Sequence, residues 1–380
     1  KGPNLVYYND PDGDGKPNSK KILLSGFGTG DSHQNINSIS WGHDGYLWFT
    51  QGYHAFAQVE TVHGLERLAK SGVFRYNPKT GRLHTFFGQG RAGYNCWGAK
   101  TDDWGETIHI SGADPSIFDT LSGAVSITEG PNQSREFCPT PGRKKCDMEI
   151  IQSSHFPKEM QGQMWTATFY SSQINVFETG LKDGKWQSKE LPAVIPRAHR
   201  AFRPLEIKVG PQGALYILDW YNEIIGHYQA SYKDPRRDKS HGRIWRVSYK
   251  NRLLVKKESF AEKSVKDLIG LLQSPERFNR RIARSFLMNK PRNEVLKELA
   301  SFQALNTQHE VQILGLYQAC EEVNVKLLER LLSHEDSRAR SAAVLAVGRW
   351  ADRLENPLSY LKNSVQDKDS RVRAHSVVAA

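Results

Sequence analysis

The uneven distribution of glycine and tryptophan along the chain most strongly limits what it can fold into. Residues 1–251 hold 28 of the 31 glycines and eight of the nine tryptophans. Glycine-rich and aromatic-rich sequence with frequent turns favours short β-strands, whereas glycine-poor sequence rich in Leu, Ala, Glu, Lys and Arg favours helices. We therefore predict an all-β region over residues 1–251 and an all-α region over residues 252–380.

A turn glycine followed by alternating apolar residues recurs through the first region. Gly45, Gly105, Gly162 and Gly213 lie 60, 57 and 51 residues apart. Repetition at about 40–60 residues, with several short strands in each repeat, is typical of a β-propeller. Because a ring of only four blades is uncommon, we predict a propeller of the six-bladed type that is incomplete at its N-terminus. The chain begins at Lys1 without a signal peptide, so we expect it to be a segment of a longer protein.

Two nearly identical segments mark a repeat in the second region. Residues 336–344 read DSRARSAAV, and residues 369–377, which lie 33 positions later, read DSRVRAHSV. Weaker copies make positions 281, 312, 340 and 373 equivalent, at intervals of 31, 28 and 33 residues. The period resembles that of HEAT repeats, in which each helix pair buries its apolar face against its neighbours. We predict a HEAT-like or armadillo-like α-solenoid over residues 252–380.

The charge of the chain is basic but evenly spread. The formal net charge is +11, and residues 252–380 contribute 22 basic against 16 acidic residues. A nucleic-acid-binding protein usually concentrates Lys and Arg on one face or tail, so we expect no nucleic-acid partner. No apolar run reaches the ~20 residues that a membrane-spanning helix needs, so we also expect no membrane span in this segment.

The sharpest local motif is the loop DPDGDGKPN at residues 10–18. Ca²⁺ prefers clustered oxygen ligands, and a tightly turned loop with glycines can bring alternate carboxylates onto one ion. The twelfth loop position is Lys21, where an EF-hand has glutamate. The motif therefore predicts a structural Ca²⁺ site of the DxDGDG type, and an acidic turn without metal is the alternative. The predicted ligands are Asp10, Asp12, Asp14, the carbonyl of Lys16 and Asn18.

A histidine between short polar residues follows in the segment GDSHQNIN at residues 30–37. A loop histidine of this kind is a frequent general base, because it titrates near working pH and the loop can present it to a cavity. His33 is therefore a candidate catalytic residue. A structural or surface histidine is the alternative.

Several longer motifs share one resemblance. They are LSGFGTGD at 24–31, VFRY at 73–76, HFP at 155–157, FRP at 202–204, GPQGALYILDWY at 210–221, GHY at 226–228, DPRRD at 234–238 and HGRIWRV at 241–247. From Asn4 to about Arg252 the pattern resembles the quinoprotein dehydrogenase-like propellers of the soluble glucose and sorbosone dehydrogenase superfamily. It is most similar to large bacterial proteins described as membrane-bound dehydrogenases, in which HEAT repeats and often a cytochrome c domain follow the propeller.

This resemblance implies a cofactor and a set of residues around it. Pyrroloquinoline quinone (PQQ) would lie over the channel mouth, and a histidine would take the hydroxyl proton while hydride passes to a quinone polarised by a second Ca²⁺. His33 matches that histidine, and Asn95 matches the Asn of the Arg-Asn-Pro-x-Gly loop, although Tyr94 and Cys96 replace the Arg and Pro. The remaining candidates for the polar lining, for which structural hydrogen bonds between strands are the alternative, are Arg203, Asp219, Tyr221, His227 and Arg237.

The resemblance also implies partners and a location. The expected substrate is a sugar or polyol, and the HEAT region is expected to dock a protein partner, with a cytochrome c as the candidate electron acceptor. A periplasmic or secreted location is implied, and a disulfide between Cys138 and Cys146 would fit it. No Cys-x-x-Cys-His motif is present, so we expect no c-type haem in this segment. The competing hypothesis is a propeller module that binds carbohydrate or protein without catalysis.

Overall fold

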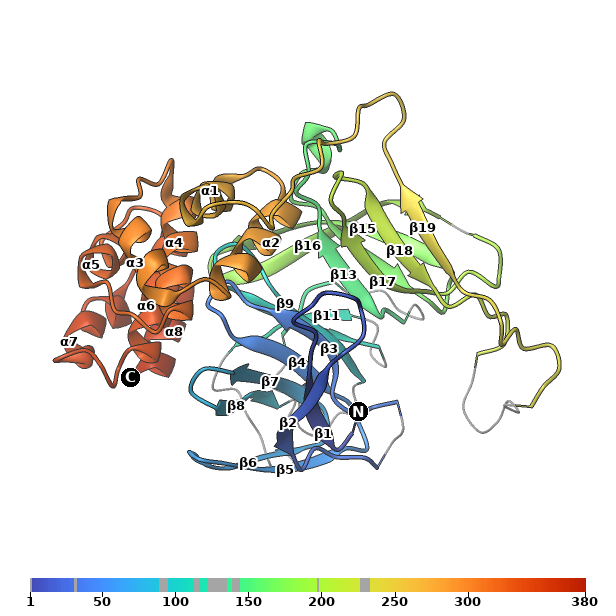
Figure 1. Ribbon diagram of the computed structural model, residues 1–380, viewed down its shortest axis with the longest axis horizontal. Helices are drawn as coiled ribbons and strands as arrows, with labels where there is room; N and C mark the ends of the chain where they lie inside the picture. Colours follow the sequence, from blue (N-terminus) through green and yellow to red (C-terminus); the bar gives the residue numbers. More distant parts are fainter. Residues whose placement is uncertain are drawn as a thin grey trace. The chain divides into compact units, whose positions relative to one another are not determined.

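The computed structural model describes residues 2–30, 33–88, 95–112, 116–121, 135–138, 144–196, 198–225 and 233–380 (Figure 1). This part of the chain divides into two compact units. The first comprises Lys1–Gly42, Tyr46–Lys100 and Thr107–Glu136, and the second comprises His43–Gly45, Thr101–Glu106 and Phe137–Ala380. The second unit thus contains the helices together with the strands that follow residue 137. The domain boundary after residue 251 stays a prediction.

The first unit is built from antiparallel sheets of short strands. One four-stranded sheet has the order β3-β4-β7-β8, and the hairpin β5-β6 lies in the chain between β4 and β7. A second has the order β9-β10-β11-β12, and β1 pairs with β2 in a two-stranded sheet. The strands are β1 (Asn4–Asn9), β2 (Ser19–Ser25), β3 (Asn37–Trp41), β4 (Leu47–Gln51), β5 (Phe56–Thr61), β6 (Gly64–Ala69), β7 (Gly72–Asn77), β8 (Arg82–Gly88), β9 (Cys96–Thr101), β10 (Thr107–Ser111), β11 (Ser116–Asp119) and β12 (Arg135–Glu136).

The second unit contains two further antiparallel sheets. One has the order β13-β14-β15-β16 and the other the order β17-β18-β19. Their apolar faces share a core that includes Trp165, Ile174, Ile207 and Ile217, all at most 1% exposed. The strands are β13 (Asp147–Ile150), β14 (Met164–Thr168), β15 (Gln173–Lys182), β16 (Lys185–Ile195), β17 (Pro204–Val209), β18 (Leu215–Asp219) and β19 (Arg243–Val247).

The turn glycines occupy the same position in each of the four larger sheets. Gly45, Gly105, Gly162 and Gly213 all have positive φ angles, of 80°, 89°, 78° and 78°. Each lies two residues before the second strand of its sheet, namely β4, β10, β14 and β18. A residue with a β-carbon adopts this left-handed backbone only with strain, so glycine is the residue that these turns select. The repeated signal in the sequence therefore marks the same turn in four successive sheets.

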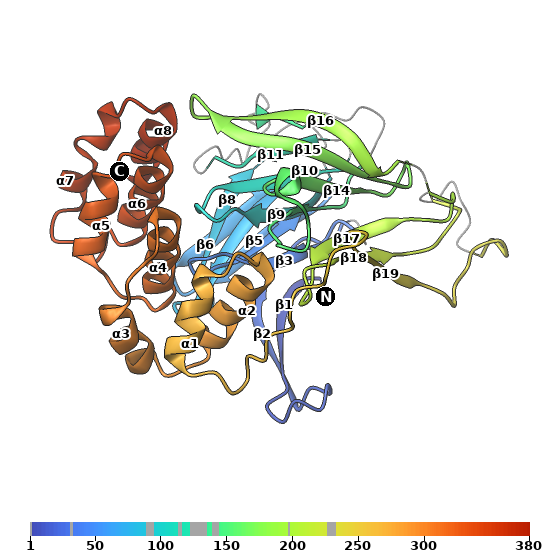
Figure 2. The ribbon, with the colours of Figure 1, turned by 90° about the horizontal axis from the view of Figure 1, so that it is seen from above.

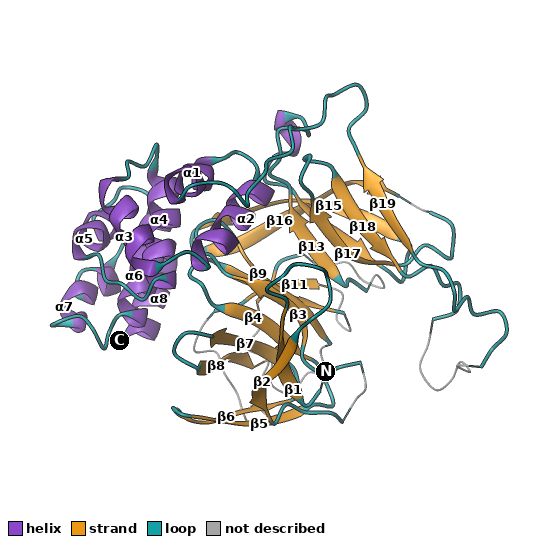
Figure 3. Cartoon of the chain, in the orientation of Figure 1, coloured by secondary structure: helices purple, strands orange, loops and turns teal. Residues whose placement is uncertain are grey.

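Eight α-helices follow among the described residues (Figure 3). α6 packs against both α4 and α8, and Figure 2 shows these helices in succession. The four copies of the sequence repeat fall in α2, α4, α6 and α8. The helices are α1 (Val265–Gly270), α2 (Arg277–Met288), α3 (Arg292–Ser301), α4 (Thr307–Ala319), α5 (Val325–Leu332), α6 (Ser337–Arg349), α7 (Pro357–Leu361) and α8 (Ser370–Ala379).

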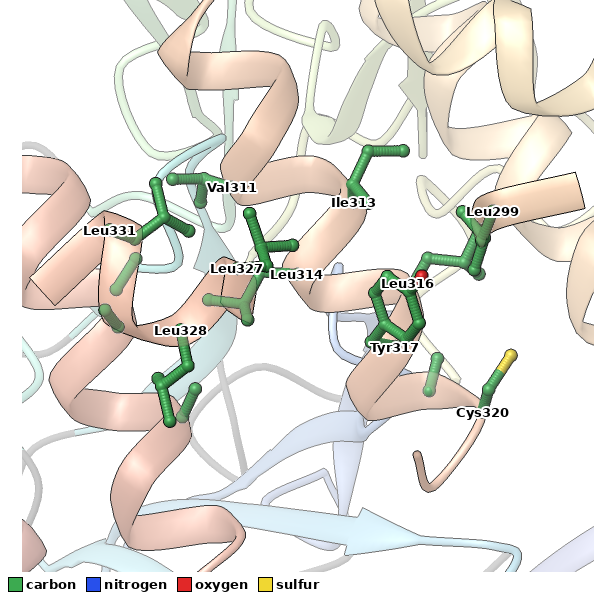
Figure 4. Packing of buried hydrophobic residues seen from close by; sticks show 14 of the residues in the cluster. Leu299, Val311, Ile313, Leu314, Leu316, Tyr317, Cys320, Leu327, Leu328 and Leu331 are labelled. Carbon is green, nitrogen blue, oxygen red and sulfur yellow. The ribbon is translucent and has the colours of Figure 1, made fainter. Parts of the chain in front are cut away.

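One continuous apolar core joins the helices from Phe260 to Val372. Figure 4 shows its central part, where Leu314 of α4 and Leu327 and Leu328 of α5 lie together.

The near-identical DSR segments of the sequence begin two of the helices. Asp336 and Asp369 precede α6 and α8, and their side chains accept hydrogen bonds from the amides of Arg338 at 2.9 Å and Arg371 at 2.8 Å. The repeated aspartate is thus the N-cap that starts each helix.

The order of a β-region followed by an α-region is confirmed. The closing of the sheets into a six-bladed ring and the HEAT type of the helical stack stay predictions. No helix among the described residues is long and apolar enough to cross a membrane. Cys138 and Cys146 are both thiols in the structure and do not form the expected disulfide.

Candidate functional site

His33 lies on the loop before β3 in the first unit, and it contacts the start of β9. Its ring stacks on Trp97, with ring centroids 5.8 Å apart and an interplanar angle of 19°. The two segments are also joined by hydrogen bonds, because Asn37 Nδ2 donates to the carbonyl of Cys96 at 3.3 Å and Ser38 Oγ donates to the carbonyl of Trp97 at 2.5 Å. The ring of His33 is half-buried. The indole of Trp97 therefore lies against one face of the imidazole.

Asn95 lies in the first unit, two residues before Trp97 in the chain, and so belongs to the segment that His33 contacts. It is half-buried, and its carbonyl accepts a hydrogen bond from the amide of Gly112 at 2.7 Å. The thiol of Cys96 is fully buried, and this burial raises its pKa. Tyr94 lies outside the described residues. Two predicted site residues that are 62 positions apart in the sequence, His33 and Asn95, are thus on adjoining loops.

Arg203 of the second unit has a structural set of partners. Its side chain is 6% exposed. Its Nε donates to the carbonyl of Asn222 at 2.8 Å and its Nη2 donates to that of Glu223 at 3.2 Å. Its Nη1 donates to the carbonyl of Phe169 at 3.0 Å and to Ser172 Oγ at 2.8 Å. The guanidinium therefore joins loops at the strand ends, which favours the structural alternative for Arg203.

The carboxylate of Asp219, at the end of β18, also forms hydrogen bonds with groups of the protein. Its Oδ1 accepts from the amides of Arg203 and Tyr221, both at 2.8 Å, and its Oδ2 accepts from Trp245 Nε1 at 2.9 Å. The carboxylate is 1% exposed. Tyr221 has a positive φ of 53°, and the guanidinium of Arg243 lies 3.4 Å from its ring centroid. These contacts connect β17, β18 and β19 and leave no carboxylate oxygen of Asp219 without a protein donor.

Of the last two cofactor candidates, Arg237 and His227, the structure describes only Arg237. Arg237 Nη1 donates to the carbonyl of Ile224 at 2.9 Å, and the side chain is half-buried. His227 lies outside the described residues. The quinone-binding role of Asn95, Arg203, Asp219, Tyr221, His227 and Arg237 stays a prediction. Within the second unit, the hydrogen bonds of Arg203 and Asp219 favour the structural alternative for these two residues.

The acidic loop between β1 and β2 brings its carboxylates together. One oxygen from each of Asp10, Asp12 and Asp14 lies within 4.8 Å of the others, and all three residues are exposed. Asp10 accepts hydrogen bonds from the amides of Gly13 at 2.9 Å and Gly15 at 3.1 Å. These bonds turn the loop so that alternate carboxylates face one point. The donor set suits a hard cation such as Ca²⁺.

The remaining predicted ligands lie on the same loop. Asn18 Nδ2 donates to Asp12 Oδ2 at 2.9 Å, and this bond contributes most to lowering the pKa of the Asp12 carboxyl. The amide of Lys16 donates to Asp14 Oδ1 at 2.7 Å. The amide oxygen of Asn18 and the carbonyl of Lys16 are the atoms that would complete the oxygen ligands. The Ca²⁺ site stays a prediction.

The sequence reasoning missed a set of buried ion pairs in the second unit. Asp103 Oδ2 accepts from Arg280 Nη2 at 2.9 Å, and Gln312 Nε2 donates to the carbonyl of Asp103 at 2.6 Å. Glu106 accepts from Arg371 Nε and from Ser341 Oγ, both at 2.9 Å. Burial would raise the pKa of the Glu106 carboxyl, but Arg371 and its neighbours outweigh this effect and lower the pKa to about 2. The helices thus hold the turn Thr101–Glu106 through charge.

A cavity of about 440 Å³ adjoins these pairs in the second unit. Its lining includes Asp102, Trp104, Trp186 and Arg338. The guanidinium of Arg338 lies 4.1 Å from the ring centroid of Trp104. Burial and the nearby carboxylates of Glu106 and Asp103 raise the pKa of Asp102 to about 7. The only signal in the sequence is the turn DDWG at residues 102–105, which is indistinguishable there from an ordinary hairpin turn.

Comparison with known proteins gives a family and weak structural similarities. No curated protein matches the chain. A streptogramin B lyase structure is 16% identical, with a TM-score of 0.31, over 51% of this chain and 51% of that chain. Virginiamycin B lyase from Staphylococcus aureus is 16% identical, with a TM-score of 0.31, over 60% of each chain. The chain thus spans half to three-fifths of the length of these two lyases.

A further structural similarity is to a proposed oxidoreductase (glucose dehydrogenase) from Thermus thermophilus. It is 16% identical, with a TM-score of 0.39, over 60% of this chain and 69% of that chain. Similarities at this level support neither a shared fold nor a shared activity. The family match is much more extensive, because it covers residues 1–136 and 138–251. The chain belongs to the family described as Domain of unknown function (DUF7133).

Proposed function

We propose that the chain is part of a dehydrogenase that oxidises a hydroxyl group of a sugar or polyol, with His33 as the general base. The observation that carries this proposal is the stacking of His33 on Trp97 at 5.8 Å, which places the histidine loop beside the loop of Asn95. The sequence resemblance assigns the base to the first loop and a cofactor contact to the second. Their adjacency is what one reaction centre would require.

The imidazole of His33 would accept the hydroxyl proton as the carbon–oxygen bond gains double-bond character. Trp97 packs against one face of the ring. This contact would help to orient the base toward the substrate, and a fixed orientation lowers the entropic part of the barrier. Asn95 offers an amide that can donate to a substrate or cofactor oxygen. A bound quinone would supply the two-electron acceptor.

The second unit supports a different candidate function. Arg203 and Asp219, which the resemblance assigns to the cofactor, already hold strands and loops with their charged groups. This observation favours a propeller module that binds carbohydrate or protein without catalysis. The two candidates differ in one measurable property, which is quinone binding.

Partners and location are part of the same proposal. A cytochrome c would accept electrons from a dehydrogenase of this kind, and the helical region would dock it. Several arginines of the helices already pair with carboxylates of their own unit, as Arg349 does with Asp44 and Arg371 does with Glu106. A docking partner would therefore meet other helix surfaces. A periplasmic or secreted location fits the resemblance.

The test is a titration of the full chain with PQQ in the presence of Ca²⁺, followed by quinone absorbance. The dehydrogenase proposal requires saturable binding, and binding should persist in His33→Asn because the variant removes only the base. His63→Asn is the matched control, since His63 is an exposed histidine of the same unit on the β5–β6 turn. Absence of quinone binding by the parent chain would favour the non-catalytic module.

A further inference from the structure

The cavity of about 440 Å³ beside the turn Thr101–Glu106 is lined entirely by residues of the second unit. This turn, the hairpin of β15 and β16, and the first turns of α6 and α8 all contribute to the lining. Ser370 Oγ at the start of α8 donates to the carbonyl of Asp183 in the hairpin at 2.8 Å, so these two parts of the wall are in contact. A site of this volume suits a small organic ligand.

Asp102 contributes a carboxylate oxygen without a protein donor to this lining. Its Oδ1 accepts from the amides of Trp104 and Glu106, both at 2.9 Å, so its own turn holds the side chain in place. Its Oδ2 accepts no hydrogen bond from any residue that the structure describes. The residue is half-buried and lines the cavity. An acceptor in such a place gains from a donor that a ligand supplies.

The charges around Asp102 favour a cation as that donor. Burial and the like charges of Glu106 and Asp103 raise the pKa of Asp102 to about 7. The arginines of α2 and α6 whose charge acts on Asp102 already pair with other carboxylates, Arg277 with Asp103 and Glu149, and Arg338 with Asp336. The ionised form of Asp102 thus has no counter-charge of its own, and a bound cation would supply one.

Asp369 adds a second carboxylate to the lining. It is half-buried, and its Oδ1 accepts from the amide of Arg371 at 2.8 Å as the N-cap of α8. Its Oδ2 accepts from no group in the described part of the chain. The arginine whose charge acts on Asp369 is Arg340, which pairs with Asp367 at 2.6 Å. The cavity therefore has more negative charge than its own arginines neutralise.

The lining also offers neutral hydrogen-bonding groups that no other group engages. The hydroxyls of Thr179 in β15 and Ser337 in α6 and the Nε1 of Trp104 line the cavity in half-buried positions. Within the described residues, none of these three groups forms a hydrogen bond. Hydroxyls both donate and accept, whereas the indole nitrogen only donates. Hydroxyl groups of a ligand can therefore pair with all three.

A metal ion fits this lining less well than an organic cation. Among the described residues, three side-chain ligand atoms lie within 4.8 Å of one another only in the loop with Asp10, Asp12 and Asp14. The carboxylates of the cavity do not converge in this way. An extended ligand can reach groups that are farther apart, and the indole rings of Trp104 and Trp186 offer apolar surface to its carbon chain.

We propose that this cavity binds a protonated organic amine that carries hydroxyl groups. The ammonium would donate to Asp102 Oδ2, and Asp369 would add to the negative potential that attracts it. The hydroxyl groups would exchange hydrogen bonds with Thr179, Ser337 and Trp104. His33 and Asn95 do not line the cavity, so the site does not depend on the proposed dehydrogenase activity.

Isothermal titration calorimetry of the full chain in phosphate buffer tests the site with 1-amino-1-deoxysorbitol. Sorbitol, which has a hydroxyl in place of the ammonium, and ethylammonium, which has no hydroxyl, are the comparison probes. At pH 8 the amino polyol should bind at least about tenfold more tightly than either. Sorbitol binding as tightly would overturn the role of the carboxylates, and ethylammonium binding as tightly would overturn that of the hydroxyl groups.

Two variants locate the site. Asp102→Asn keeps the acceptor for both backbone amides but removes the charge, so it should weaken binding of the amino polyol about tenfold at pH 8. In the parent, affinity should fall by a similar factor from pH 8 to pH 6 as Asp102 takes up a proton, and the variant should lose this dependence. Asp369→Asn, which preserves the N-cap, should also weaken binding.

Asp352→Asn is the matched control, since the Asp352 side chain is 71% exposed and lies outside the lining. This variant should bind the amino polyol like the parent, with the same change between pH 8 and pH 6. Unchanged affinity in both Asp102→Asn and Asp369→Asn would refute the proposal. No binding of the amino polyol by the parent chain would refute it as well.

Discussion

Replacing Glu106 with glutamine should destabilise the second unit strongly. Glu106 and Arg371 are 3% and 4% exposed, and the guanidinium donates to the carboxylate through Nε at 2.9 Å. Glu106→Gln keeps the shape of the side chain but removes the charge, so the buried guanidinium loses this counter-charge. Removing one partner of a buried ion pair typically costs ~3–5 kcal/mol.

The pKa of Glu106 gives a second magnitude for the same interaction. It falls from 4.5 to about 2 on folding, because Arg371 and its neighbours outweigh the opposing effect of burial. At about 1.4 kcal/mol per pKa unit, this shift corresponds to roughly 3 kcal/mol of stability. Because the pKa of the folded state is depressed, the contribution is fully present above the unfolded pKa of about 4.5. It is lost as pH falls from there through about 2.

Urea unfolding followed by tryptophan fluorescence measures this effect. At pH 7 we expect Glu106→Gln to lower the free energy of unfolding by about 3 kcal/mol, and the difference from the parent should shrink as pH falls below 4. Arg371→Met should cost a similar amount, and the double variant should cost clearly less than the sum, since both members of the pair are then gone. Glu329→Gln, at an exposed position of α5, is the control. A loss below about 1 kcal/mol, or strictly additive losses, would refute the reasoning.

Three further predictions concern other parts of the chain. Ca²⁺ should raise the melting temperature by binding the loop at residues 10–18, EDTA should reverse the rise, and a variant Asp12→Ala that still responds like the parent would exclude the site. Proteolysis should cut within Tyr249–Lys257, yet the two fragments should elute together in native size-exclusion chromatography. The reason is that the helices and the strands after residue 137 form one compact unit. Separate elution of the fragments would contradict this unit. Asp219→Ala should lower the melting temperature by at least about 5 °C through loss of three hydrogen bonds, and an unchanged melting curve would argue against the structural role of this carboxylate.

Local features of the fold could be read from the sequence because their causes are local. A positive φ angle selects glycine at the turns before β4, β10, β14 and β18, so the spacing of the turn glycines reveals the repeated sheets. Likewise, Asp336 and Asp369 cap helices through bonds to residues two positions later. These interactions leave a mark within a few residues of sequence.

Contacts between distant segments could not be read in the same way. Glu106 and Arg371 are 265 positions apart, and nothing in the neighbouring residues of either shows that they pair. For the same reason, the sequence could not separate a cofactor-binding Arg203 from one that holds strand ends. Its partners are carbonyl groups, which every residue possesses. The adjacency of His33 and Trp97 is likewise visible only in the structure, although the residues of each loop mark it as a candidate site.

The proposed role of His33 is tested most directly by dye-coupled oxidation of a panel of aldoses and polyols by the full chain, supplied with PQQ and Ca²⁺. The parent should oxidise at least one compound of the panel. His33→Asn should lower the rate by ~10²–10⁴-fold, the usual cost of losing a positioned general base, while quinone binding and the melting temperature stay unchanged. His63→Asn should retain the parent rate. Equal rates in the parent and in His33→Asn would contradict the assignment of His33 as the base.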